Sequence, residues 1–231
     1  MPYYGFFDPT YILIIIGAVI SMIASAKVNA TFQRYNQVRS MSGMTGAQAA
    51  ERILKSQGLY GVRIEHISGN LTDHYDPRAK VLRLSDAVYN STSVAAIGVA
   101  AHECGHAIQD EREYAPLRIR NAIVPAANFG SKACWIFIIG GVLFGANSFL
   151  INIGILLFSL AVLFQIVTLP VEFDASRRAI AILGETGTLG NEEIQGTKKV
   201  LSAAALTYVA SAAAAILSLL RLLILFGDRR D

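Results

Sequence analysis

Long stretches without a charged side chain constrain the fold of this chain more than any other feature. No charged residue occurs between positions 133 and 171, and 53% of the chain is hydrophobic whereas only 16% is charged. Soluble domains usually carry about 25% charged residues, and a membrane helix needs about 20 consecutive apolar residues. The sequence therefore predicts an α-helical integral membrane protein with about four transmembrane helices. These are expected at residues 6–26, 122–145, 149–171 and 201–225.

The predicted spans have individual features that bear on topology. The first is interpreted as an uncleaved anchor because residues 1–26 contain no Lys or Arg, although Ala24 and Ala26 resemble a signal-peptide cleavage site. The second must carry Lys132, and a break at 145–148 would turn it into a hairpin with the third. The fourth contains Arg221 and precedes a charged C-terminus. A re-entrant or folded-back fourth segment is therefore an alternative to a full crossing.

The basic residues predict the orientation of the spans. Twelve Lys or Arg residues lie between Lys27 and Arg120, and four more lie between Val171 and Val200, whereas the N-terminus and the 145–148 turn have none. Cytoplasmic segments next to membrane spans are enriched in Lys and Arg. Segments 27–120 and 172–200 are thus expected in the cytoplasm, with the N-terminus outside and the lipid bilayer as a partner. No basic-aromatic pattern or phosphate-binding loop indicates nucleic acid.

Residues 27–120 are expected to form one small α+β domain. An amphipathic helix is predicted over 45–57 with Gly58 as its stop. Alternating residues predict strands at 61–67 and 80–84, and a third strand leads into the turn at Pro77. A second helix, over 94–108, follows the N-cap candidates 91–93. An exposed strand edge beside that helix could bind an extended peptide through main-chain hydrogen bonds.

The second helix contains the motif His102-Glu103-Cys104-Gly105-His106. Histidines four residues apart lie on one face of a helix and can bind the same Zn²⁺ ion. Glu103 would project near the metal without binding it and take a proton from water that zinc has acidified. The motif therefore predicts one zinc per chain and a general base. Cys104 points off the ligand face and is expected to be a buried small residue.

Catalytic zinc has three protein ligands and an open position, so a third ligand is required. Glu172 follows the third span and returns to the side of the membrane that holds the motif, because the second and third spans form a hairpin. His74, His66 and Asp174 are the alternatives. Glu172 and Asp174 could instead be an N-terminal charge pair with Arg177 and Arg178.

The predicted chemistry is hydrolysis of a peptide bond in a protein or peptide substrate bound in extended form. Arg178, Arg177 and His74 are candidates for stabilising the oxyanion. Two alternatives remain. A protease site inside the bilayer is disfavoured because only eight apolar residues precede His102 and charged residues follow at once. The other is a non-catalytic membrane scaffold or adaptor with a structural or vestigial metal site. Formation of a homo-oligomer, or binding of a partner protein, is also possible.

The motif, the later run Glu172-Phe173-Asp174-Ala175-Ser176 and the flanking spans resemble the YugP-type membrane zinc metallopeptidases of bacteria. More distantly, the chain is similar to the HtpX and CAAX-prenyl membrane proteases. The resemblance implies a gluzincin site of His102, His106 and Glu172 on a zincin-like domain in the bacterial plasma membrane, with the active site facing the cytoplasm. The distant pattern has an Asp in the second shell of the metal where this chain has Ser176. Asp174 is a candidate for that supporting role.

Overall fold

The computed structural model describes residues 8–227. Phe6 and Phe7 of the first predicted span, and the charged C-terminus Asp228–Asp231, lie outside the described residues. The described chain divides into two compact units. Unit 1 comprises residues 8–24, 119–169 and 207–227, and unit 2 comprises Ser25–Arg118 and Pro170–Leu206.

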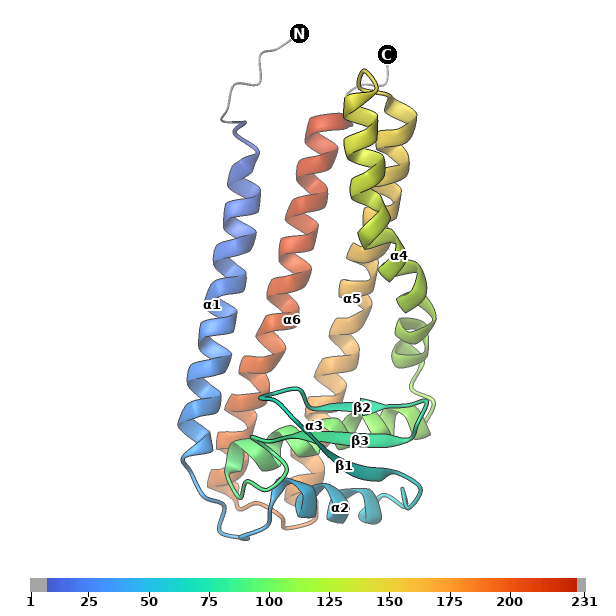
Figure 1. Cartoon of the computed structure of the whole chain (residues 1–231). Coiled ribbons are helices and arrows are strands. Elements are labelled where there is room, and N and C mark those ends of the chain that lie inside the picture. The colour runs from blue at the N-terminus through green and yellow to red at the C-terminus, as the bar shows by residue number, and fades with distance from the viewer. Residues whose placement is uncertain (1–7, 228–231) are drawn as a thin grey trace. The chain divides into compact units, whose positions relative to one another are not determined.

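Four long helices dominate the chain (Figure 1). Each is long and apolar enough to cross a membrane, as judged by length and composition. They run beyond the predicted spans because their polar ends belong to unit 2. The fourth, in particular, is one uninterrupted helix of 36 residues. The four are α1 (Tyr11–Asn36), α4 (Ala115–Leu143), α5 (Ser148–Glu185) and α6 (Asn191–Phe226).

Within unit 1, glycines let α4 and α5 approach closely on either side of a short turn. A Cβ added at Gly154 would lie 2.9 Å from the carbonyl oxygen of Cys134, and one at Gly130 would lie 2.6 Å from that of Leu157. Such contacts are tighter than any side chain allows, so these positions need glycine. The turn between the helices uses Gly145 at φ +75°, a backbone conformation that glycine adopts without strain.

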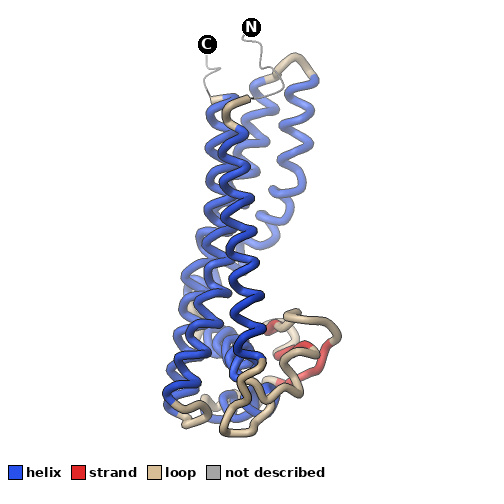
Figure 2. The backbone as a smooth tube through the Cα atoms, turned by 90° about the vertical axis from the view of Figure 1, so that its left-hand side faces the viewer, coloured by secondary structure: helices blue, strands red, loops and turns tan. Residues whose placement is uncertain are grey.

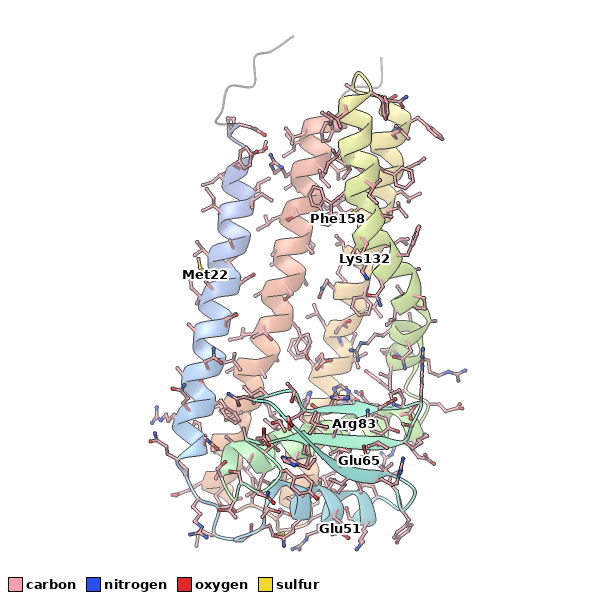
Figure 3. The ribbon with its side chains drawn as sticks, viewed as in Figure 1. Met22, Glu51, Glu65, Arg83, Lys132 and Phe158 are labelled. Atoms are coloured by element: carbon pink, nitrogen blue, oxygen red, sulfur yellow. The ribbon has the colours of Figure 1, made fainter. Side chains whose placement is uncertain are left out.

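Unit 2 contains the predicted three-stranded sheet, whose strands are β1 (Arg63–Ile67), β2 (His74–Asp76) and β3 (Val81–Ser85). Their order is β1-β3-β2, with β1 parallel and β2 antiparallel to β3. All three strands are short, and they are the red segments of Figure 2. Across β1 and β3, Arg83 Nε lies 3.3 Å from a carboxylate oxygen of Glu65 (Figure 3). The sheet leaves β1 and β2 as its edges.

Two helices of unit 2 begin at, or one residue after, their predicted starts. In α2 (Gly46–Ser56), Thr45 and Gln48 form a capping box, which satisfies two backbone N–H groups that the first turn leaves without partners. In α3 (Val94–Glu111), the Ser93 hydroxyl accepts a hydrogen bond from the Ala96 N–H. Gly58 follows α2 at φ +76°. The predicted stop of the first helix is therefore present.

The core of unit 2 forms around α3. Ile97, Ala101 and Ile108 of α3 are buried in one hydrophobic cluster with Ile53 of α2 and Leu82 of β3. The same cluster includes residues from the polar ends of α5 and α6, namely Ala179, Ile182, Leu183 and Leu201. Segment 170–206 therefore packs in one unit with the motif helix, although more than 50 residues separate them in the chain. This packing positions the residues described next.

Candidate metal centre

The motif helix α3 brings two imidazoles to one face. His102 and His106 are one turn apart, and their ring centroids lie 4.7 Å from each other in an edge-to-face arrangement. No proline interrupts this part of α3, which extends three residues past the predicted end. Side chains at i and i+4 project in the same direction. The pair therefore forms half of a metal site by local structure alone.

The second half comes from α5, and Gly105 allows it to approach. A Cβ added at Gly105 would lie 2.5 Å from the carbonyl oxygen of Ala175, well inside van der Waals contact. The backbone of α5 thus lies directly against α3 at the motif. Glu172, one turn before Ala175 and 2% exposed, consequently faces the two histidines.

The three side chains form a group that could hold a metal ion. One ligand atom from each of His102, His106 and Glu172 lies within 4.8 Å of the other two. Glu172 Oε2 is 3.3 Å from His102 Nε2 and 3.6 Å from His106 Nε2. Two ligands bound tetrahedrally to one zinc ion, each at 2.0–2.1 Å, are separated by about 3.3 Å. The donor set and its spacing therefore fit zinc.

The electrostatics of the group also favour a cation. Burial opposes the charge of His106, but its hydrogen bond to Glu172 and the charges of Glu103 and Glu172 outweigh burial and raise the pKa of His106 above its usual value. Glu103 is itself 8% exposed and lies on the same helix. Two buried carboxylates beside two imidazoles create a negative site. A divalent cation would be stabilised there.

Each histidine has a different partner at its other ring nitrogen. The Ser176 hydroxyl lies 3.1 Å from His102 Nδ1, and Gln109 Oε1 lies 3.0 Å from His106 Nδ1. Gln109 is completely buried, and its amide nitrogen donates to Asp174 Oδ2 at 2.9 Å and to the Val171 carbonyl at 2.8 Å. Asp174 therefore reaches His106 only through Gln109. Asp174 is thus linked to His106 by two successive hydrogen bonds although it is two residues from Glu172.

Other residues proposed from the sequence have partners of their own. His66 Nε2 pairs with Asp86 at 2.7 Å, and His74 Nδ1 lies 2.9 Å from the Thr72 carbonyl. Both histidines belong to the sheet, outside the group of three. Arg177 and Arg178 both bond to Asp174, and the Arg178 guanidinium carbon lies 5.7 Å from the centroid of the Tyr114 ring.

Cys104 is fully buried, with its sulfur 3.7 Å from the Ala50 carbonyl oxygen. Burial, with the nearby charge of Glu103, raises the pKa of this thiol well above its usual value. A thiol in such surroundings stays protonated, whereas metal binding requires the thiolate. Cys104 therefore packs between α3 and α2, as a small core residue would.

Sequence reasoning missed Gln109 and the packing role of Gly105. Gln109 is three residues after His106, the spacing at which side chains on a helix touch, so this signal was available. Gly105 gave no comparable signal, because its need for a small side chain comes from a carbonyl of α5 that is distant in sequence.

The chain is similar to known proteins over nearly its whole length. The sequence profile of a family described as "Putative neutral zinc metallopeptidase" matches residues 10–227. The chain is also 48% identical over 222 residues to a protein of Bacillus subtilis (strain 168) named "Putative membrane protease YugP". That match covers 96% of this chain and 98% of the other protein. No solved structure matches the chain. The family profile matches nearly the whole chain, and the chain has two histidines and a glutamate that could bind zinc. The chain therefore belongs to this zinc metallopeptidase family.

Proposed function

We propose that this protein is a membrane-embedded zinc metalloendopeptidase. His102, His106 and Glu172 hold one zinc ion, and Glu103 is the general base. The observation that carries the proposal is the convergence of three ligand atoms from α3 and α5 at spacings that suit zinc. The buried Glu103 adjoins the first ligand. A purely structural site would have no use for a base at that position.

The residues of this chain would share the chemistry as follows. When bound, zinc supplies a Lewis acid that polarises the scissile carbonyl and acidifies water. Glu103 removes a proton from the attacking water and later delivers a proton to the leaving amine. His102, His106 and Glu172 would hold the ion as its three protein ligands. Arg178, Arg177 and His74 remain the candidates for stabilising the oxyanion.

The substrate would be an extended peptide that adds to the sheet. β2 is an edge strand that packs against α3, and the unpaired backbone groups of an edge strand can bind a further strand. His74 lies on β2 with its side chain exposed. A peptide paired with this edge would run alongside the motif helix.

We further propose a multi-pass location in a bacterial cell membrane, with unit 2 in the cytoplasm. Four helices are long and apolar enough to cross, and the basic residues of the chain are concentrated in unit 2. The relative from Bacillus subtilis is named as a membrane protease, which supports the same location. The more distant likeness to the HtpX and CAAX-prenyl proteases stays a prediction.

Metal removal tests the proposed function. We expect the full-length protein, in detergent or nanodiscs, to cleave members of a peptide library, to lose this activity with 1,10-phenanthroline, and to regain it when zinc is added. Zinc-loaded protein that cleaves no peptide across the library, yet captures a membrane partner, would instead favour the scaffold.

Gln109 and Ser176 are proposed to orient the two histidine ligands. Loss of such outer partners typically weakens metal binding about 10- to 100-fold, and we expect this range for Gln109→Leu and for Ser176→Ala in a zinc competition titration. Gln57→Ala is the control, because Gln57 also accepts a hydrogen bond, from Arg112, but follows the last residue of α2 and is not a partner of either histidine. Unchanged zinc affinity in both test variants would rule out an orienting role.

A further inference from the structure

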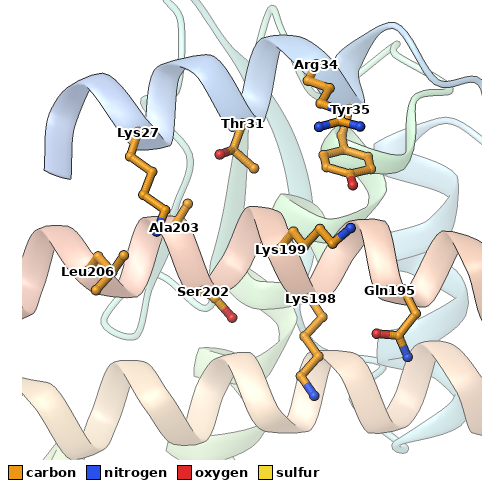
Figure 4. Close-up of a pocket in the computed structure, with 10 residues that line it drawn as sticks. All are labelled: Lys27, Thr31, Arg34, Tyr35, Gln195, Lys198, Lys199, Ser202, Ala203 and Leu206. Atoms are coloured by element: carbon orange, nitrogen blue, oxygen red, sulfur yellow. The ribbon is translucent and has the colours of Figure 1, made fainter. Parts of the chain in front are cut away.

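A groove between the C-terminal part of α1 and the N-terminal part of α6 gathers four cations. Lys27 and Arg34 extend into it from α1, and Lys198 and Lys199 lie on α6 (Figure 4). All belong to unit 2. The groove has a volume of about 460 Å³, within the usual range of roughly 300–1,000 Å³ for small-molecule sites. It is separate from the metal centre in its residues and in its chemistry.

No carboxylate lining the groove compensates its charges, although the Arg34 guanidinium lies over the Tyr35 ring, 5.7 Å from the ring centroid. No Asp or Glu is among its lining residues, and within residues 8–227 none of the four cations takes part in an ion pair. Like charges held close together repel one another, and a concave wall concentrates their field. A cluster of this kind is stabilised by an anion.

The fold brings the two basic faces together at a fixed place. A Cβ added at Gly196 would lie 2.8 Å from a ring carbon of Tyr35, so α6 approaches α1 closely because residue 196 is glycine. Tyr35, Thr31 and Ser202 also line the groove and add hydroxyl donors to the four cations. Oxygen-rich anions such as phosphate accept several such hydrogen bonds at once.

We propose that this groove binds the phosphate group of an anionic phospholipid. Lys27 is the first charged residue after the apolar run of α1, and Lys199 is the last before the apolar run of α6. The groove therefore lies where both helices change from polar to apolar, with Ala203 and Leu206 on its apolar side. Basic clusters next to membrane spans bind anionic headgroups. A zwitterionic headgroup fits less well, because its amine would meet the same four cations.

The inference rests on the proposed membrane location and not on the proposed peptidase chemistry. It is tested on the full-length protein in a neutral detergent, with bound lipid counted by native mass spectrometry. We expect dioctanoyl phosphatidylglycerol to bind at least tenfold more tightly than dioctanoyl phosphatidylcholine. Each juxtamembrane lysine contributes about a fivefold gain in affinity, so the double variant Lys198→Gln/Lys199→Gln should bind roughly 25-fold more weakly.

A matched variant separates the groove from general surface charge. Lys55→Gln/Arg78→Gln also removes two positive charges from unit 2, but both lie outside the groove. This variant should keep the wild-type affinity for phosphatidylglycerol. Equal phosphatidylglycerol binding by the groove variant and the wild type would overturn the proposal. Glycerol 3-phosphate binding as tightly as the lipid would also overturn it, in favour of a soluble phosphate ligand. Zinc content, measured in the same samples, should be unchanged in both double variants, so the two proposals fail separately.

Discussion

Glu103→Gln is expected to reduce peptide hydrolysis by about 10²- to 10⁴-fold while the chain still binds one zinc ion. The size of the effect is that of losing general acid–base catalysis. Glutamine has nearly the same shape as glutamate, so the packing of α3 around this buried position is preserved. The amide cannot accept the proton of the attacking water. Initial rates on a peptide substrate, together with zinc per chain by elemental analysis, check both halves of the expectation.

The matched control for this variant is Glu111→Gln. Glu111 is the last residue of the same helix and is exposed, so removing its charge alters the helix but not the site. The Glu111→Gln variant should retain the wild-type rate of peptide hydrolysis. Peptide cleavage at the wild-type rate by zinc-loaded Glu103→Gln would exclude Glu103 as the base and with it the proposed mechanism.

The sequence was informative about the fold wherever the signals are local. The amphipathic pattern of 45–57, and the N-cap candidates 91–93 before an alanine-rich stretch, predict two helices that the structure has. Alternation in 61–67 and 80–84 predicts strands that pair as β1 and β3. Local signals cannot show that segment 170–206 packs in one unit with 25–118, because that packing depends on side chains such as Ile108 and Leu183, which are far apart in the chain.

The candidate site likewise has one part that local sequence signals predict and one part that depends on contacts between distant segments. The spacing of His102 and His106 is a property of one helix and could be predicted from it. Glu172 could be proposed only from topology and resemblance, since its distance from the histidines depends on how α3 meets α5. The link from Asp174 to His106 runs through Gln109 and involves two elements. No pattern within either element contains it.

Glu172→Ala is expected to weaken zinc binding by at least about 100-fold, beyond the 10- to 100-fold that outer partners contribute. The substitution removes one of three ligands and leaves two histidines, which cannot complete a catalytic zinc site. It also removes a buried negative charge that would stabilise a cation between α3 and α5. Glu185→Ala is the control, because Glu185 ends the same helix and is exposed.

The most direct test of the zinc site is therefore the zinc content per chain of the full-length wild type, Glu172→Ala and Glu185→Ala, purified side by side and measured by elemental analysis. About one zinc is expected in the wild type and in Glu185→Ala, and markedly less in Glu172→Ala. Equal zinc in all three would contradict the site of His102, His106 and Glu172 and return the third-ligand question to His74 and His66. A wild type without metal, even after zinc is supplied, would contradict the zinc peptidase itself.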